Sequence, residues 1–508
     1  MTITLTLNPK TLTESQSISA SSFVKSVTDS AKRSITEYSV YDSGADGGYF
    51  MLNGVALSDG AWHTLTAAQF AQLVYVAGSS AGTDTVEIKA YDGKTWSSAY
   101  STKETTTAPS SPTTPVSLLE ELGFTATAAA ALITASGSPT YSGSLTYNNM
   151  LAILNQAAVG GMTATKFSAL QSLASMLNQS GGLSTSAYVQ QIADDVINGN
   201  SANASWNGGS STATKLGNLS ATSTQTQVDD LIDKWFLGTD LPSLSVSAIG
   251  ESNYNPTYQT SALPLFNPNT NAPSYLDVNQ GYLGDCYFVA ALGEVALQDP
   301  SAIENMITDN GNGTYSVLFY VNGQPDYVTV NGELPYMSGG YQWANGSTQE
   351  FANGTLDDWV ALVEKAFVEL NEQTSAASYG GHTTGNAYED VNGGTAITLS
   401  EITDQTFNTY NLSPSESTSS LNSLASILAA DFAAGDDIIL STPTADNGNL
   451  VGDHMFIVTG VTSAGAISIQ NPWNSAYSGS LQMSFTDTLK QLAADNVSIY
   501  VTTGTAVA

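Results

Sequence analysis

The spacing of apolar and polar residues changes character along the chain, and the first block alternates over short distances. Up to about residue 106, runs such as "SITEYSVYD", "AQLVYVAG" and "DTVEIKAYDG" alternate apolar with polar positions and are separated by turn residues. Runs of this length and spacing predict an all-β sandwich. We therefore expect a β-sandwich module over residues 1–106.

Apolar positions then take up a helical period. A Pro/Ser/Thr-rich stretch over residues 107–117 predicts an extended linker. Beyond it, apolar residues recur every three or four positions, as in Phe167, Leu170, Ala174 and Leu177. Residues 118–246 therefore predict an all-α middle domain. It has two interpretations, a scaffold or a prosegment that masks the following domain until it is removed.

Helices and strands mix in the last block, residues 260–508, which predicts an α+β domain. Asn322-Gly323 marks the turn of a hairpin. The last third reads as short strands, including "DDIILST", "HMFIVTGV" and "AISIQNPW". The segment "DDWVALVEKAFVEL" predicts an amphipathic helix that buries Trp359, Leu362, Val363, Ala366 and Leu370.

One residue of this block carries candidate chemistry, because Cys286 is the only cysteine among 508 residues. The run "YFVAALGEVAL" that follows it is apolar on every face, which predicts a buried helix. Gly281 and Gly284 precede it and allow a sharp turn. The sulfur would then lie at a helix N-terminus, where the thiolate is favoured. The alternative is an inert, buried thiol that only packs.

A thiol nucleophile needs a base and an oxyanion donor, and the same block offers both. His454 begins "HMFIVTGV", and the turn "TSAG" reverses the chain into "AISIQNPWN". Antiparallel pairing would make His454 and Asn471 neighbours, so that the Asn carbonyl orients the imidazole. Gln280 could point its amide at the oxyanion. The two remaining histidines are interpreted as a surface residue (His63) and a loop residue near the substrate (His382).

Three of these segments resemble the calpain-type, papain-fold cysteine proteases: "QGYLGDCYFVAAL", "DHMFIVTGV" and "QNPWN", in the family's order. The resemblance covers about residues 260–508. It implies Cys286 as nucleophile, His454 as general base and acid, Asn471 as orienting residue and Gln280 as oxyanion donor. It also implies that Trp473 and Gly394 line the substrate groove.

The family is calcium-dependent in animals, and Asp277 matches one of its calcium-binding carboxylates. Its partner glutamate is missing here, and no EF-hand loop occurs. We therefore expect chemistry that requires no cofactor, with Asp277 as a candidate calcium ligand. Separately, "YDSGADGGYFMLNGVAL" resembles the cadherin-like or Ig-like modules of bacterial surface and secreted proteins.

The net charge limits which classes of partner suit this chain. The sequence has 12 Lys+Arg and 45 Asp+Glu, which give a net charge of −33. Nucleic acid is an unsuitable partner, since clustered basic residues are absent. The acidic surface either keeps the chain soluble or collects divalent cations. No run approaches a membrane span, and the N-terminus lacks the pattern of a cleaved signal peptide. We expect secretion or surface display by another route, while a cytoplasmic location stays open.

Three functions follow from these features. The leading hypothesis is a cysteine endopeptidase that acts on protein or peptide substrates. The second is an extracellular adhesion protein, in which residues 1–106 contact cell surfaces or matrix and the protease fold is latent or vestigial. The third is acyl transfer to an amine, which uses the same thiol and imidazole chemistry.

Overall fold

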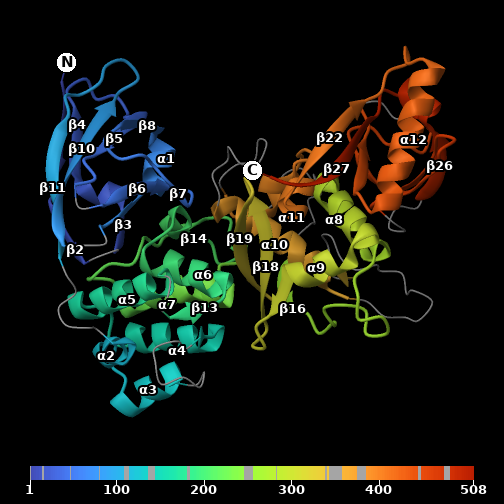
Figure 1. Cartoon of the computed structure of the whole chain (residues 1–508). Coiled ribbons are helices and arrows are strands. Elements are labelled where there is room, and N and C mark those ends of the chain that lie inside the picture. The colour runs from blue at the N-terminus through green and yellow to red at the C-terminus, as the bar shows by residue number, and fades with distance from the viewer. Residues whose placement is uncertain are drawn as a thin grey trace. The chain divides into compact units, whose positions relative to one another are not determined.

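The computed structural model describes residues 2–13, 16–45, 47–78, 81–107, 114–134, 144–179, 183–244, 256–281, 283–337, 340–341, 357–373, 385–443, 448–473 and 481–507. They form two compact units, shown in Figure 1. The first comprises Met1–Trp206 and Lys215–Trp235, and the second Asn207–Thr214 and Phe236–Ala508. Within the described residues, no helix has the length and apolar character needed to cross a membrane.

Strands dominate the first unit up to Thr107. A five-stranded sheet has the order β2 (Lys10–Thr13), β11 (Tyr100–Thr107), β10 (Gly82–Tyr91), β5 (Glu37–Asp42), β8 (Trp62–Thr66). A four-stranded sheet has the order β3 (Ser17–Ser19), β9 (Val74–Val76), β6 (Tyr49–Leu52), β7 (Val55–Ala56). Two further strands pair with each other, β1 (Ile3–Leu7) and β4 (Val24–Asp29), and α1 is a short helix (Ala67–Gln72).

Along the strands of this part, buried residues alternate with more exposed ones, and the buried residues form its core. In β10, every second residue from Asp84 to Ala90 is buried, so one face of the strand points inward. Tyr75 sits at the centre of the core and contacts Phe23 and Phe50 edge-to-face. This arrangement gives aromatic rings the geometry they prefer.

Helices dominate the first unit from Pro115 on: α2 (Pro115–Glu121), α3 (Ala126–Thr134), α4 (Tyr147–Ala158), α5 (Ala164–Leu177), α6 (Ala187–Ile197) and α7 (Gln225–Ile232). A π-helical stretch, Asp233–Leu237, continues α7. Short strands lie between the helices: β12 (Ser144–Leu145), β13 (Ser184–Thr185), β14 (Ser205–Trp206) and β15 (Thr214–Lys215). Residues 108–113 of the expected linker lie outside the described residues, and α2 already begins within it at Pro115, capped by Thr114. The division into separate β and α domains stays a prediction.

The second unit begins with helices and two small sheets. The helices are α8 (Cys286–Gln298), α9 (Pro300–Met306), α10 (Trp359–Gln373) and α11 (Thr398–Thr403). One sheet has the order β17 (Ile307–Asp309), β18 (Thr314–Val321), β19 (Gln324–Asn331), and the other β16 (Thr257–Thr260), β20 (Glu333–Met337), β21 (Gly340–Tyr341). The predicted hairpin turn is confirmed, because Asn322 and Gly323 join β18 to β19 with positive φ angles.

The second unit ends in a six-stranded antiparallel sheet. Its order is β22 (Gln405–Asn411), β27 (Ser498–Ala506), β23 (Ile438–Ser441), β24 (Met455–Val461), β25 (Ala466–Gln470), β26 (Ser484–Thr488). Two helices accompany it, α12 (Thr418–Ala434) and α13 (Leu489–Ala494), and Figure 1 shows α12 lying along the sheet. The alternation of β24 sends Ile457 into the core around α8 and Phe456 into the core under α12.

The prediction for "DDWVALVEKAFVEL" was right about the helix and wrong about its exposure. The five apolar positions are buried in α10, but so are its charged residues, including Glu364, Lys365 and Glu369. Lys365 can be buried because its Nζ donates to Asn331 Oδ1 at 2.6 Å and to the carbonyl of Glu333 at 3.1 Å. The helix is therefore buried on every face, and its lysine is compensated by internal acceptors.

Candidate active site

The loop before α8 places Cys286 at the first position of that helix. The residues after it, from Tyr287 to Ala296, are buried, as the apolar run predicted. The thiol itself is half-buried. Backbone N–H groups of Met455, Tyr287 and Cys286 face the sulfur and favour its ionised form. The sulfur therefore lies between the start of α8 and the start of β24.

The resting thiol is nevertheless neutral at physiological pH. Burial raises the pKa of the Cys286 thiol to about 11, and the neighbouring carboxyl group of Asp285 adds to the rise. The N–H groups at the helix N-terminus oppose this effect without overcoming it. A base must therefore remove the thiol proton when the nucleophile attacks.

His454, directly before β24, offers such a base and is held by Asn471. The imidazole Nε2 lies 2.9 Å from Asn471 Oδ1. That oxygen also accepts the backbone N–H of Trp473 at 3.0 Å. Because Oδ1 is thereby fixed as an acceptor, Nε2 of His454 must donate, which leaves Nδ1 as the basic nitrogen. The Trp473 ring lies against the imidazole, with centroids 4.6 Å apart.

The ring of His454 is buried and uncharged. Burial lowers the pKa of the imidazole to about 4, and the hydrogen bond with Asn471 only partly opposes this shift. The hydrogen bonds of the described residues include none between the thiol of Cys286 and the imidazole. The resting pair therefore consists of a neutral thiol and a neutral base.

The hairpin that brings His454 to Asn471 was predicted from the sequence and is confirmed. β24 and β25 pair antiparallel, with Ile457 opposite Gln470. The His454 backbone is fixed on its other side by Thr442, whose Oγ1 accepts the His454 N–H at 3.2 Å. The base is therefore anchored on both flanks, by the residues that directly follow β23 and β25 of the same sheet.

Helix α8 and strand β24 pack without a gap. A Cβ added to Gly293 would lie 2.3 Å from Cδ1 of Ile457, so a side chain at this position would have to displace the end of Ile457. One residue later, Oε2 of the buried Glu294 accepts the backbone N–H of Val458 at 3.0 Å. These contacts fix the helix that carries the thiol against the strand that carries the base.

Gln280, the predicted oxyanion donor, joins the two loops of the site. Its backbone N–H donates to the carbonyl of Pro472 at 2.8 Å. Its side-chain Nε2 donates to the carbonyl of Leu283 at 2.6 Å. An amide nitrogen carries two N–H groups, so one remains for a substrate oxygen. Its role as oxyanion donor stays a prediction.

Of the two predicted groove residues, Gly394 has a clear packing role. A Cβ at this position would lie 2.4 Å from the ring of Tyr287, which donates its hydroxyl to the carbonyl of Val391 at 3.0 Å. Nearby, the N–H of Gly284 donates to Asn392 Oδ1 at 2.7 Å. The loop thus braces the nucleophile segment, while contact of Gly394 and Trp473 with substrate stays a prediction.

The surroundings of Asp277 do not favour a calcium ion. Its Oδ2 accepts Nε1–H of Trp359 at 2.9 Å and the N–H of Ser274 at 2.7 Å. Two N–H donors already occupy that oxygen, whereas calcium needs six to eight oxygen ligands. In the ranges that the structure describes, no group of three acidic, His or Cys side chains could hold a metal ion. The donor set around Asp277 therefore does not fit calcium.

The other two histidines lie apart from this arrangement. His63 is on β8 of the first unit, where its Nε2 contacts the carbonyl of Ser58 at 2.8 Å. His382 lies outside the described residues. Sequence reasoning missed two buried carboxyl groups beside the site, Asp285 and Glu364. The position of Asp285, next to the single cysteine, was the only signal available.

Comparison with known proteins agrees with this geometry. Residues 258–488 match the family described as "Calpain family cysteine protease". These residues form a calpain-family cysteine protease domain. The calpain family comprises cysteine-type endopeptidases, which are hydrolases, and the segment includes Cys286, His454 and Asn471.

Curated relatives match the calpain-family domain over part of their length. Calpain clp-4 of Caenorhabditis elegans is 29% identical over 221 residues, which cover 40% of this chain and 28% of the relative. Calpain clp-1 of the same organism is 32% identical over 131 residues, 25% of this chain and 16% of the relative. The calpain-2 catalytic subunit of Bos taurus is 30% identical over 132 residues, which cover 25% of this chain and 18% of the relative. The chain therefore spans less than a third of these relatives.

Proposed function

We propose that the calpain-family domain hydrolyses peptide bonds of protein substrates through a covalent intermediate on Cys286. The observation that carries this proposal is the hydrogen bond from His454 Nε2 to Asn471 Oδ1, next to a thiol at a helix N-terminus. This bond leaves the other imidazole nitrogen basic, as a nucleophilic mechanism requires.

In the acylation half, Nδ1 of His454 takes the proton of the Cys286 thiol while Sγ attacks the carbonyl carbon of the scissile bond. The carbonyl oxygen becomes an oxyanion, which accepts N–H groups from the Cys286 backbone and from the Gln280 side chain. The imidazolium then gives its proton to the leaving amine, the C–N bond breaks, and a thioester remains on Cys286.

In the deacylation half, His454 removes a proton from a water molecule that attacks the thioester carbon. The C–S bond breaks, the sulfur regains a proton from the imidazolium, and a carboxylic acid leaves. Each step uses the thiol, the imidazole and amide N–H groups of this chain. Water as acceptor distinguishes hydrolysis from transfer of the acyl group to an amine.

The test is labelling of the full chain by an epoxide-type cysteine protease inhibitor, with calcium and with a chelator, followed by peptide mass spectrometry. We expect the label on Cys286, and cleavage of an unfolded protein substrate that the Cys286→Ala variant has lost. Cleavage by Cys286→Ala equal to that of the unmodified chain would contradict the proposal. Labelling that occurs only with calcium would show that an ion assembles the site.

Location and attachment form a further part of the proposal. We infer a bacterial protein, secreted or displayed at the cell surface, because the acidic, Lys-poor composition and the β-strands of residues 1–106 suit that setting. Those residues would contact cell-surface or matrix material. Pull-down of the full chain on intact cells, with the protease blocked by the epoxide, tests this contact.

A further inference from the structure

Asp285 is buried next to the nucleophile in an unusual way. It occupies the N-cap position of α8, where an Asp side chain ordinarily accepts N–H groups of the first turn. Here its side chain makes no capping hydrogen bond. The residue has no exposed surface, and neither Oδ1 nor Oδ2 accepts a hydrogen bond. The backbone N–H groups of Cys286 and Tyr287 are therefore left to the sulfur and the substrate.

The carboxyl group of Asp285 faces two other side chains of the site. Glu364, from the buried helix α10, and Gln280 both lie beside it. Other titratable groups that interact with Asp285 are Cys286 and Tyr287, which follow it on α8. Two buried carboxyl groups side by side cannot both be ionised without a large cost, so the pair holds a proton.

The place of that proton matters for catalysis. An ionised Asp285 would repel the thiolate of Cys286 and the oxyanion, and it would attract the free N–H of Gln280. A neutral Asp285 carries no such charge, whereas the hydrogen-bonding side chain of Glu364 favours the ionised form, because it lowers the pKa of Asp285. Burial raises the pKa of Asp285 to about 7, and the side chains of Glu364 and Gln280 partly offset the rise.

We propose that Asp285 is a positioning residue that must be a neutral carboxylic acid for turnover, so that the amide of Gln280 stays available to the oxyanion. This inference rests on the proposed function of Cys286 and Gln280. The site then holds a second proton, on Asp285, in addition to the proton that passes between the thiol and the imidazole. Ionisation of Asp285 switches the oxyanion site off while the fold stays intact.

The test is the dependence of kcat/KM on pH, from about pH 5 to about pH 9, for the full chain and a peptide substrate. The unmodified chain should lose activity as the pH rises through about 7, where Asp285 loses its proton. Asp285→Asn cannot ionise. We expect it to lose up to about tenfold in kcat at pH 6 and to lack the decline near neutral pH.

A second readout isolates the oxyanion site. A peptide aldehyde forms a hemithioacetal with the thiol, and its oxygen takes the oxyanion position. Its affinity should fall with rising pH in the unmodified chain and stay constant in Asp285→Asn. A matched control is Asp357→Asn, which replaces another buried carboxyl group whose pKa is raised, to about 8. We expect this control to keep the decline of the unmodified chain.

The proposal is overturned by any of three results. Asp285→Asn shows the same decline as the unmodified chain, or it is folded but inactive at every pH, or Asp357→Asn loses the decline as well. Near-ultraviolet circular dichroism establishes that each variant is folded. Failure of the proposed function looks different, because the unmodified chain then neither cleaves the peptide nor takes the epoxide label on Cys286.

Discussion

Asn471 Oδ1 accepts two hydrogen bonds at once, from His454 Nε2 at 2.9 Å and from the backbone N–H of Trp473 at 3.0 Å. The second bond fixes the amide, and the fixed amide fixes the imidazole. Orientation of the base therefore depends on a side chain that takes no part in proton transfer. Replacing it should reduce turnover without unfolding the domain.

We expect Asn471→Ala to lower kcat by roughly 10- to 1000-fold, because the imidazole is then free to adopt the wrong tautomer or direction. The measurement is steady-state cleavage of a peptide substrate. Asn449→Ala is a matched control, since this Asn accepts the N–H of Gln482 and donates to its Oε1, both in exposed hydrogen bonds. An Asn471→Ala variant with the kcat of the control would contradict an orienting role.

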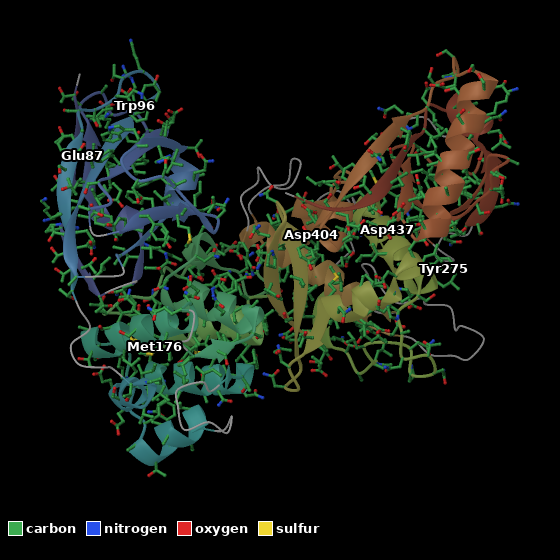
Figure 2. The ribbon with its side chains drawn as sticks, in the orientation of Figure 1. Glu87, Trp96, Met176, Tyr275, Asp404 and Asp437 are labelled. Atoms are coloured by element: carbon green, nitrogen blue, oxygen red, sulfur yellow. The ribbon has the colours of Figure 1, made fainter. Side chains whose placement is uncertain are left out.

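Glu294 tests the contact between α8 and β24. Its Oε2 accepts the N–H of Val458, and burial together with the carboxyl group of Asp437 raises its pKa well above the usual range. Asp437, which is labelled in Figure 2, directly precedes β23 in the sequence. A neutral Glu294 accepts this bond as well as an amide would, so Glu294→Gln should be tolerated.

Glu294→Ala, by contrast, leaves the N–H of Val458 buried without its acceptor and opens a cavity. We expect it to lower the free energy of unfolding by about 2–4 kcal/mol relative to Glu294→Gln. Urea denaturation followed by tryptophan fluorescence measures the difference. Equal stability of the two variants would mean that the hydrogen bond to β24 contributes nothing.

The buried carboxyl group of Asp357 should make the free energy of unfolding depend on pH. Neither of its buried carboxyl oxygens accepts a hydrogen bond, and burial, followed by the charges of Asp277 and Asp358, raises its pKa to about 8. The folded state therefore keeps a proton that the unfolded state releases above about pH 4. As pH rises from there to about 8, the unfolded state is increasingly favoured.

Asp357→Asn removes this effect, because an amide does not titrate. We expect the variant to be more stable than the unmodified chain by about 1–3 kcal/mol at pH 8.5, with the advantage shrinking toward pH 4. Chemical denaturation at several pH values checks it, with Glu304→Gln as a control that removes an exposed carboxyl group. An advantage of Asp357→Asn that grows toward acid pH would reverse the sign of the argument.

Substitution of Gly394 tests how tightly its loop packs against the helix that carries the nucleophile. Because a Cβ here would lie 2.4 Å from the ring of Tyr287, Gly394→Ala must displace that ring or the loop. We expect a loss of about 1–3 kcal/mol in the free energy of unfolding. Gly332→Ala is the matched control, since its Cβ would meet its nearest atom, the carbonyl oxygen of Gly313, only at 4.0 Å. Similar stability losses in both would refute the steric explanation.

Local pattern was enough to predict part of the site. The turn "TSAG" between two short strands sets an antiparallel register, and that register alone places His454 beside Asn471. The apolar run after Cys286 likewise predicts a buried helix, because no face of it suits water. Both inferences need only neighbours in the sequence.

Contacts between distant segments escaped prediction. Charged residues in "WVALVEKAFVEL" suggest an exposed face, and only the fold reveals that Lys365 reaches Asn331 and Glu333. The proximity of Asp285 to Glu364, and of Glu294 to Val458, depends on how helices from separate segments pack. Periodicity carries no information on such pairs.

The isolation of Cys286 also bears on how the site responds to oxidants. The half-buried thiol is the only one in the sequence. When an oxidant converts a thiol to a sulfenic acid, a second cysteine in the same chain can rescue it as a disulfide. No other residue of this sequence can do so. Recovery depends on small thiols from the surroundings, so the redox poise of the medium sets how long the site stays reactive.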